Sequence, residues 1–147
     1  MNGRKTHVLF LCTGNSARSL MAEAFVNEHA GERFVAHSAG LQPKGVNPYT
    51  VRVMAELGIS LEGARSKSVR EFLGRERLDY VITVCGEAEA NCPRVFPGTV
   101  KYRHWSFEDP AAFEGPEAAT LETFREVRDE IRARVQAWLQ ETADVPV

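Results

Sequence analysis

The sequence predicts an α/β fold: a small, doubly wound, four-stranded parallel sheet with helices on both faces. First, short apolar runs such as residues 7–11 and 79–84 alternate with segments of helical periodicity. Second, strands that alternate with helices favour right-handed crossovers and hence parallel strands. Third, the 147 residues contain no internal repeat or linker, which fits a single domain over residues 1–147. We expect the strand order 2-1-3-4.

The first half of the chain is predicted to form two strands and two helices. Residues 7–11 are an apolar run suited to a strand that is buried on both faces. A helix is expected over residues 19–29, followed by a second strand over residues 33–38. An Asn-Pro pair, an N-cap with a first-turn proline, begins a helix over residues 47–57.

The second half repeats the alternation. Residues 68–71, Ser-Val-Arg-Glu, have capping-box spacing and predict a short helix. Residues 79–84 give the strongest strand signal, and residues 100–105 are expected to form the fourth strand. Apolar residues then recur at helical spacing from Leu121 to Trp138, which predicts a long last helix.

Composition excludes several classes of function. A net charge of −2 argues against sequence-independent nucleic-acid binding, which needs a basic surface. The apolar run behind Arg4 and Lys5 is too short for a signal peptide or a membrane span. We therefore expect a cytoplasmic protein that binds neither nucleic acid nor membranes. The three cysteines show no Cys-x-x-Cys pair and the four histidines are scattered, so no metal site is expected.

The segment Cys12-Thr-Gly-Asn-Ser-Ala-Arg18 has the character of an anion-binding loop between a strand and a helix. Gly14 is expected to allow a sharp turn, so that successive N–H groups point inward beside the start of the following helix. Arg18 adds a planar fork of donors for a tetrahedral oxyanion, and these groups would make Cys12 a thiolate. Ser19 is a further donor for that thiolate. The predicted oxyanion-binding residues are Thr13, Gly14, Asn15, Ser16, Ala17, Arg18 and Ser19.

Two further chemically capable side chains are expected at the same edge of the sheet. Cys12 follows the first predicted strand, Cys85 follows the third, and Asp109 comes shortly after the fourth. Carboxyl ends of parallel strands share one edge, which is where such folds bind ligands. Cys85 and Cys92 either fill structural positions or form a reversible disulfide across the short loop between them.

Several stretches carry a resemblance to a known family. The segment "FLCTGNSARSLMAEA" resembles the phosphate-binding loop of the low-molecular-weight tyrosine phosphatase fold. The segments "VITVCGEAEANCP" and "HWSFEDPA" are similar to those of thioredoxin-coupled arsenate reductases, which share this fold. "SAG", "GVNP" and "FREVRDEI" match as well, so the resemblance covers nearly the whole chain.

The resemblance implies a three-cysteine reaction. Cys12 attacks arsenate, and Asp109 protonates the departing hydroxide. Cys85 then attacks Cys12 and arsenite leaves, after which Cys92 attacks Cys85 and thioredoxin reduces the resulting disulfide. The expected partners are arsenate, with phosphate or sulfate as competing oxyanions, and thioredoxin. The candidate catalytic residues are thus Cys12, Arg18, Cys85, Cys92 and Asp109, in a monomer without a cofactor.

The resemblance also bears on potassium. Some relatives bind this ion beside the loop through residues resembling Asn15, Glu23 and Ser38, with an acidic side chain near position 67. Here that position is Lys67, whose ammonium group can replace the charge of the ion. We therefore expect no potassium site.

Two alternatives remain open. The first is a protein tyrosine phosphatase or phosphomonoesterase that uses only Cys12, Arg18 and Asp109. Phosphatases of this fold usually place an aromatic residue soon after the Asp-Pro, where this chain has Ala111 and Ala112, which favours a small inorganic substrate. The second is an oxyanion- or redox-sensing binding module, which would need no proton donor.

Overall fold

The computed structural model describes residues 5–72, 78–86 and 101–143. Within them the strands are β1 (Thr6–Cys12), β2 (Phe34–Gly40), β3 (Tyr80–Thr83) and β4 (Lys101–His104). The α-helices are α1 (Arg18–Ala30), α2 (Pro48–Ala55) and α3 (Glu117–Ala143), and the 3-10 helices are η1 (Val69–Phe72) and η2 (Pro110–Ala112).

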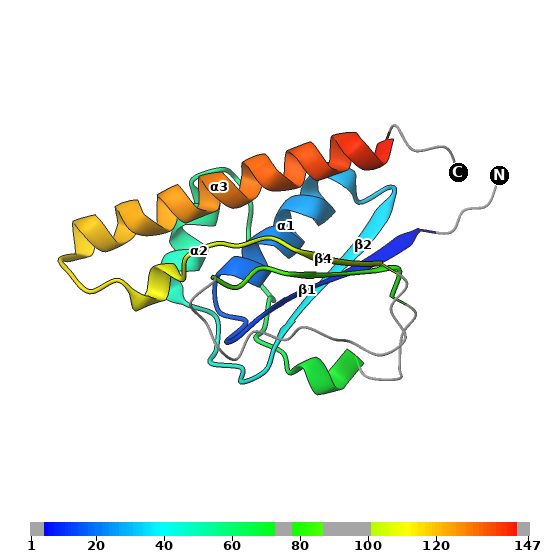
Figure 1. The fold of residues 1–147 in the computed structure, drawn as a ribbon. Helices are drawn as coiled ribbons and strands as arrows, with labels where there is room; N and C mark the ends of the chain where they lie inside the picture. Colours follow the sequence, from blue (N-terminus) through cyan, green and yellow to red (C-terminus); the bar gives the residue numbers. More distant parts are fainter. Residues whose placement is uncertain (1–4, 73–77, 87–100, 144–147) are drawn as a thin grey trace.

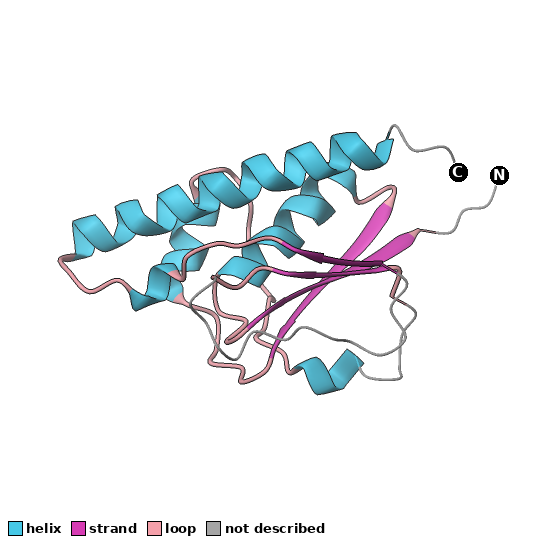
Figure 2. Ribbon diagram, in the orientation of Figure 1, coloured by secondary structure: helices cyan, strands magenta, loops and turns pink. Residues whose placement is uncertain are grey.

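The four strands form one parallel sheet in the order β2-β1-β3-β4, which confirms the predicted topology. Figures 1 and 2 show the strands running side by side beneath the long helix α3. In the pairing register Cys12 lies opposite Gly40 of β2, and Leu11 lies opposite Thr83 of β3. The carboxyl ends of β1, β2 and β3 therefore meet at one edge of the sheet.

Each face of the sheet buries its own apolar cluster. Alternate residues of β1, including Val8 and Phe10, pack with α1 and α3 on one face. The intervening residues Leu9 and Leu11 pack on the opposite face against Phe72 of η1. This alternation is the two-residue period of a strand buried on both sides, and helices cover both faces as predicted.

Several boundaries differ from the predicted ones. β2 extends to Gly40, past the predicted end at residue 38, because Gly40 still pairs with Cys12 and also bridges to Ser68. The segment with capping-box spacing forms a 3-10 helix over Val69–Phe72. Asn47 caps α2 as expected, since its side chain accepts a hydrogen bond from the Tyr49 N–H at 2.8 Å.

In the described parts of the chain, no helix combines the length and apolar character that a membrane span needs.

Candidate active site

The thiol of Cys12 lies at the end of β1, where the chain enters the loop that leads to α1. Its sulfur accepts a hydrogen bond from the Asn15 N–H at 3.2 Å and lies 2.9 Å from Ser19 Oγ. Ser19 Oγ in turn accepts a hydrogen bond from Asn15 Nδ2 at 2.7 Å, which leaves the Ser19 hydroxyl proton available to donate to the sulfur. The buried Cys12 sulfur thus faces two donors, which suit an anionic sulfur.

Asn15, and not Gly14, is the loop residue with left-handed backbone. Asn15 has a φ of 47°, and asparagine is among the few side chains that adopt this region readily. Gly14 is outside the left-handed region and lies in the bend between β1 and α1, where the sharp turn was expected. Gly14 is packed against the Lys44 side chain, since a Cβ added to Gly14 would lie 3.2 Å from Lys44 Cδ.

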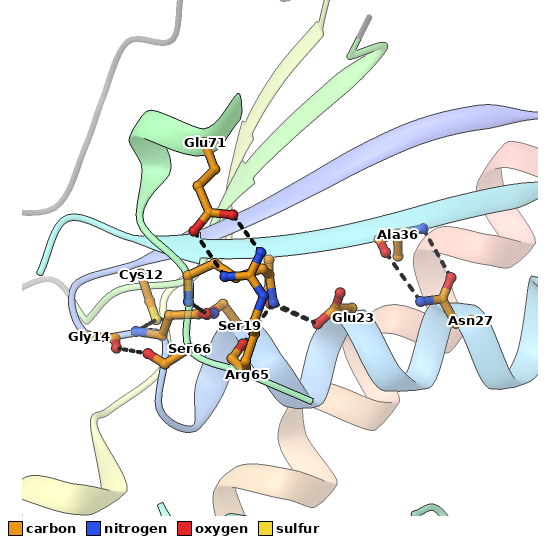
Figure 3. A network of polar contacts seen from close by, with 12 residues as sticks. Cys12, Gly14, Ser19, Glu23, Asn27, Ala36, Arg65, Ser66 and Glu71 are labelled. Carbon is orange, nitrogen blue, oxygen red and sulfur yellow. Dashed lines mark hydrogen bonds and ion pairs between the residues drawn. The ribbon is translucent and has the colours of Figure 1, made fainter. Parts of the chain in front are cut away.

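Segments after β2 and before η1 hold the loop in place by binding its carbonyl groups (Figure 3). The Ser66 hydroxyl donates to the Gly14 carbonyl at 3.1 Å, and the Gln42 N–H donates to the Thr13 carbonyl at 2.9 Å. The Thr50 hydroxyl donates to the Ser16 carbonyl at 2.9 Å. In a trans peptide the N–H points away from the carbonyl, so these bonds turn the N–H groups of the loop to the opposite side, as an anion-binding nest requires.

Arg18 and Asp109 complete the polar part of the site. Arg18 is almost fully buried, donates from Nη1 to the Phe107 carbonyl at 3.2 Å, and places Nη2 3.7 Å from Asp109 Oδ2. The Asp109 side chain is 36% exposed and accepts the Ala111 N–H at 3.0 Å, which fixes it at the start of η2. The carboxylate is therefore both positioned and open to solvent.

These groups surround a cavity of about 490 Å³. The cavity is lined by Cys12, Thr13, Gly14, Ser16, Ala17, Arg18, Lys44, Gly86, Glu108, Asp109, Ala111 and Ala112. Its lining contains no aromatic side chain among the residues that the structure describes. Of the predicted loop residues, Asn15 and Ser19 support Cys12 from behind and do not line the cavity.

Cys85 lies two residues after the end of β3 and is fully buried in the same apolar cluster as Cys12. The Val84 N–H donates to the Leu11 carbonyl at 2.8 Å, so the pairing of β1 with β3 continues up to the residue before Cys85. Cys85 takes part in a disulfide, whereas Cys12 is a free thiol. Cys92 lies outside the described residues.

Lys67 contacts the loop through its backbone and Glu23 of α1 through its side chain. Its N–H donates to Asn15 Oδ1 at 2.7 Å, and its Nζ lies 3.9 Å from Oε1 of Glu23, which also accepts the Ser38 hydroxyl at 2.7 Å. Burial raises the pKa of Glu23 above its ordinary value, against the attraction of Lys67 and the Ser38 hydrogen bond. Burial likewise lowers the pKa of Lys67, against the attraction of Glu23.

Sequence reasoning missed several residues around the site, among them Gln42 and Thr50, which bind loop carbonyl groups. Lys44 and Glu108 line the cavity, and Ser66 supports the loop. None of them belongs to the Cys-x5-Arg pattern. The sequence pointed only to Glu108, because it is adjacent to the candidate proton donor Asp109. Among the described residues no group of three or more histidine, cysteine, aspartate or glutamate side chains is arranged to hold a metal ion.

Comparisons with known proteins agree with this geometry. The chain is 40% identical over 136 residues to the arsenate reductase of Shouchella clausii (strain KSM-K16), covering 92% of this chain and 96% of that protein. It matches a solved arsenate reductase in the oxidized state with a TM-score of 0.76 and 29% identity, covering 92% of this chain and 98% of that one. It also matches a thioredoxin-dependent arsenate reductase from Corynebacterium glutamicum with a TM-score of 0.69 and 25% identity, covering 96% of this chain and 63% of that one.

The whole arrangement, from the thiol of β1 to the last helix, lies within one family match. Residues 7–145 match the family described as low molecular weight phosphotyrosine protein phosphatase. This chain therefore belongs to the low molecular weight phosphotyrosine protein phosphatase family.

Proposed function

We propose that this protein reduces arsenate to arsenite and is regenerated by thioredoxin. The observation that carries the proposal is the placement of two cysteines at the carboxyl ends of adjacent parallel strands. Cys12 ends β1 and Cys85 follows β3, and both are buried in one cluster beside the anion-binding loop. A phosphatase needs only the first of these thiols, whereas a reductase needs a second sulfur within reach.

The loop between β1 and α1 binds the oxyanion. Residues of the loop and of the start of α1 line the cavity, and Arg18 supplies a planar pair of donors. The oxyanion-binding residues in this proposal are Thr13, Gly14, Ser16, Ala17 and Arg18, with Asn15 and Ser19 holding the thiolate. Phosphate and sulfate have the same tetrahedral shape and compete for the loop.

Cys12 then acts as the nucleophile. Its thiolate attacks arsenic, and a sulfur–arsenic bond forms as an arsenic–oxygen bond breaks. Asp109 gives its proton to the departing hydroxide, which leaves as water. Arsenic is still pentavalent in this adduct, so no electrons have yet been transferred.

Reduction occurs when Cys85 attacks the sulfur of Cys12. The electron pair of the sulfur–arsenic bond moves to arsenic, and arsenite leaves. The two sulfur atoms, which have together lost two electrons, are joined as a Cys12–Cys85 disulfide. Cys92 next attacks Cys85 and frees Cys12, and the dithiol of thioredoxin reduces the Cys85–Cys92 disulfide. A disulfide-bonded Cys85 beside a free Cys12 is the combination that this sequence of exchanges produces after its last internal step.

Phosphomonoester hydrolysis is the second candidate, because the family match and the trio of Cys12, Arg18 and Asp109 favour it. The lining of the cavity favours a small inorganic oxyanion instead. Ala111 and Ala112 occupy the wall after the Asp-Pro, and Phe113 does not line the cavity. The sensing module is less well supported, since Asp109 is held beside the site in a position that suits a proton donor.

The deciding experiment is arsenate-dependent NADPH oxidation in the presence of thioredoxin and thioredoxin reductase. We expect sustained turnover for the wild type and none for Cys12→Ser. Cys92→Ser should complete about one turnover and stop with Cys12 joined to Cys85, a species that peptide mapping under non-reducing conditions identifies.

Hydrolysis of p-nitrophenyl phosphate provides the matched control. Cys85→Ser and Cys92→Ser should retain whatever phosphatase activity the wild type has, because hydrolysis uses only the first thiol. Sustained arsenate reduction by either variant would rule out the relay.

A further inference from the structure

Lys44 stands on the rim of the active-site cavity, outside the loop pattern that the sequence displays. We propose that the Lys44 ammonium group is a second cationic contact for the bound oxyanion and binds oxygen atoms that project out of the loop. The inference rests on the proposed function for the identity of the oxyanion, but it concerns binding and not reduction.

Lys44 is attached to the loop by its backbone and by its side chain. Its N–H donates to the Gly14 carbonyl at 3.0 Å. Its aliphatic carbons lie against Gly14, because a Cβ added there would be 3.2 Å from Cδ and 3.4 Å from Cγ. The next residue, Gly45, has a φ of 89°, a left-handed conformation that lets the chain turn away directly after Lys44. The side chain is therefore held along the cavity wall.

The charges in the cavity indicate why a second cation besides Arg18 would favour binding of an oxyanion. The positive charge of Arg18 is offset by Asp109 at 3.7 Å, and Glu108 adds another carboxylate to the lining. An incoming oxyanion also meets the sulfur of Cys12, which acts as a thiolate in the proposed function. Lys44 forms no ion pair with another residue of the described parts of the chain, so its charge is available to the ligand.

The contact is exposed, which limits its strength. Exposed charge pairs contribute up to about 1 kcal/mol, which corresponds to about a fivefold change in affinity. Binding that depends on such a charge also weakens with salt, because an exposed pair is screened. A contact that is present in the bound oxyanion complex and in the transition state alike changes KM and leaves kcat unchanged.

The test measures phosphate binding by calorimetry and arsenate kinetics for Lys44→Met, Lys44→Arg and Lys44→Glu. We expect Lys44→Met to weaken phosphate binding and to raise KM for arsenate about fivefold, with kcat within about twofold of the wild type. Lys44→Arg should bind phosphate about as the wild type does, because it keeps the positive charge. Lys44→Glu should bind phosphate more weakly than Lys44→Met. The difference between wild type and Lys44→Met should shrink at about 0.5 M salt.

Lys101→Met is the matched control. Lys101 is also exposed, but it lies on β4 with Nζ 5.1 Å from the centre of the Tyr80 ring, outside the cavity lining. This variant should bind phosphate as the wild type does. Unchanged phosphate affinity in both Lys44→Met and Lys44→Glu would overturn the proposal. Because calorimetry needs no turnover, a wild type that binds phosphate through Lys44 but reduces no arsenate would disprove the proposed function alone.

Discussion

The backbone N–H of Lys67 donates to the side-chain oxygen of Asn15 at 2.7 Å, across 52 positions of sequence. Asn15 also holds the Cys12 thiol, since its own N–H donates to Cys12 Sγ and its Nδ2 donates to Ser19 Oγ. One fully buried amide therefore joins the segment before η1 to the nucleophile.

Asn15→Ala should lower both stability and activity. The substitution leaves the half-buried N–H of Lys67 without its acceptor, which costs up to about 1–3 kcal/mol. It also places alanine at a φ of 47° and removes the donor that orients Ser19 toward Cys12. Urea denaturation and arsenate turnover measure the two effects.

Asn15→Gly separates backbone strain from hydrogen bonding. Glycine adopts the left-handed backbone freely, so this variant should recover part of the lost stability. It should recover none of the activity, because the bonds to Lys67 and Ser19 are still missing. Wild-type turnover in Asn15→Gly would show that the Asn15 side chain does not orient the thiol.

Gly40→Ala should disturb the loop through close packing. A Cβ at Gly40 would lie 2.8 Å from the Asn15 nitrogen and 2.8 Å from the Thr13 oxygen, both backbone atoms that cannot move alone. Overpacking of this kind costs about 1–3 kcal/mol. We expect a lower urea midpoint together with weaker phosphate binding.

Gly14→Ala is the comparison for Gly40→Ala. The new Cβ at Gly14 would meet only the flexible side chain of Lys44, at 3.2 Å. The loss of stability should therefore be smaller than for Gly40→Ala. Equal losses of stability in the two variants would mean that the close approach of β2 to the loop is not the reason why position 40 requires glycine.

Lys67→Met should change how stability depends on pH. The pKa of Glu23 is already raised by burial, and Lys67 opposes that rise. A carboxyl group with a raised pKa binds its proton more tightly in the folded state, so stability falls as pH rises from the ordinary pKa to the folded pKa. Without Lys67 the pKa of Glu23 rises further, so this decline should become larger and extend to higher pH.

Urea midpoints between pH 5 and pH 8 measure the decline, and Glu23→Gln combined with Lys67→Met should abolish it.

The stability and turnover of the wild type should not change when potassium replaces sodium, because the Lys67 ammonium group lies beside Glu23. A potassium-dependent gain in stability or turnover would contradict this expectation.

The parallel sheet could be predicted from the sequence because each apolar run is short, ends in turn residues and is followed by a helical pattern, and the order 2-1-3-4 expected for a doubly wound sheet is confirmed. The loop was equally accessible, since Cys12 and Arg18 lie within one short segment. The left-handed backbone of Asn15 was not predicted, because it is stabilised by side-chain bonds to Ser19 and to the distant Lys67 that only the folded chain makes.

Lys44 and Ser66 were out of reach for a different reason. They come to the loop because β2 continues to Gly40 and packs against the backbone of Thr13 and Asn15. This approach depends on tertiary packing, and no local sequence pattern around the two residues indicates it. Lys67 was placed beside the loop only by the family resemblance.

Asp109→Asn should slow formation of the thiol–arsenic adduct. Asparagine retains the oxygen that accepts the Ala111 N–H at 3.0 Å, so η2 should keep its place, but the amide has no proton to give the departing hydroxide. General acid catalysis typically contributes about 10²–10⁴-fold, and we expect kcat to fall by that order. Glu108→Gln makes the same carboxyl-to-amide change in the same cavity and should stay within about twofold of the wild-type rate. Single-turnover release of arsenite measures both variants, and equal losses would assign the effect to charge and not to proton transfer.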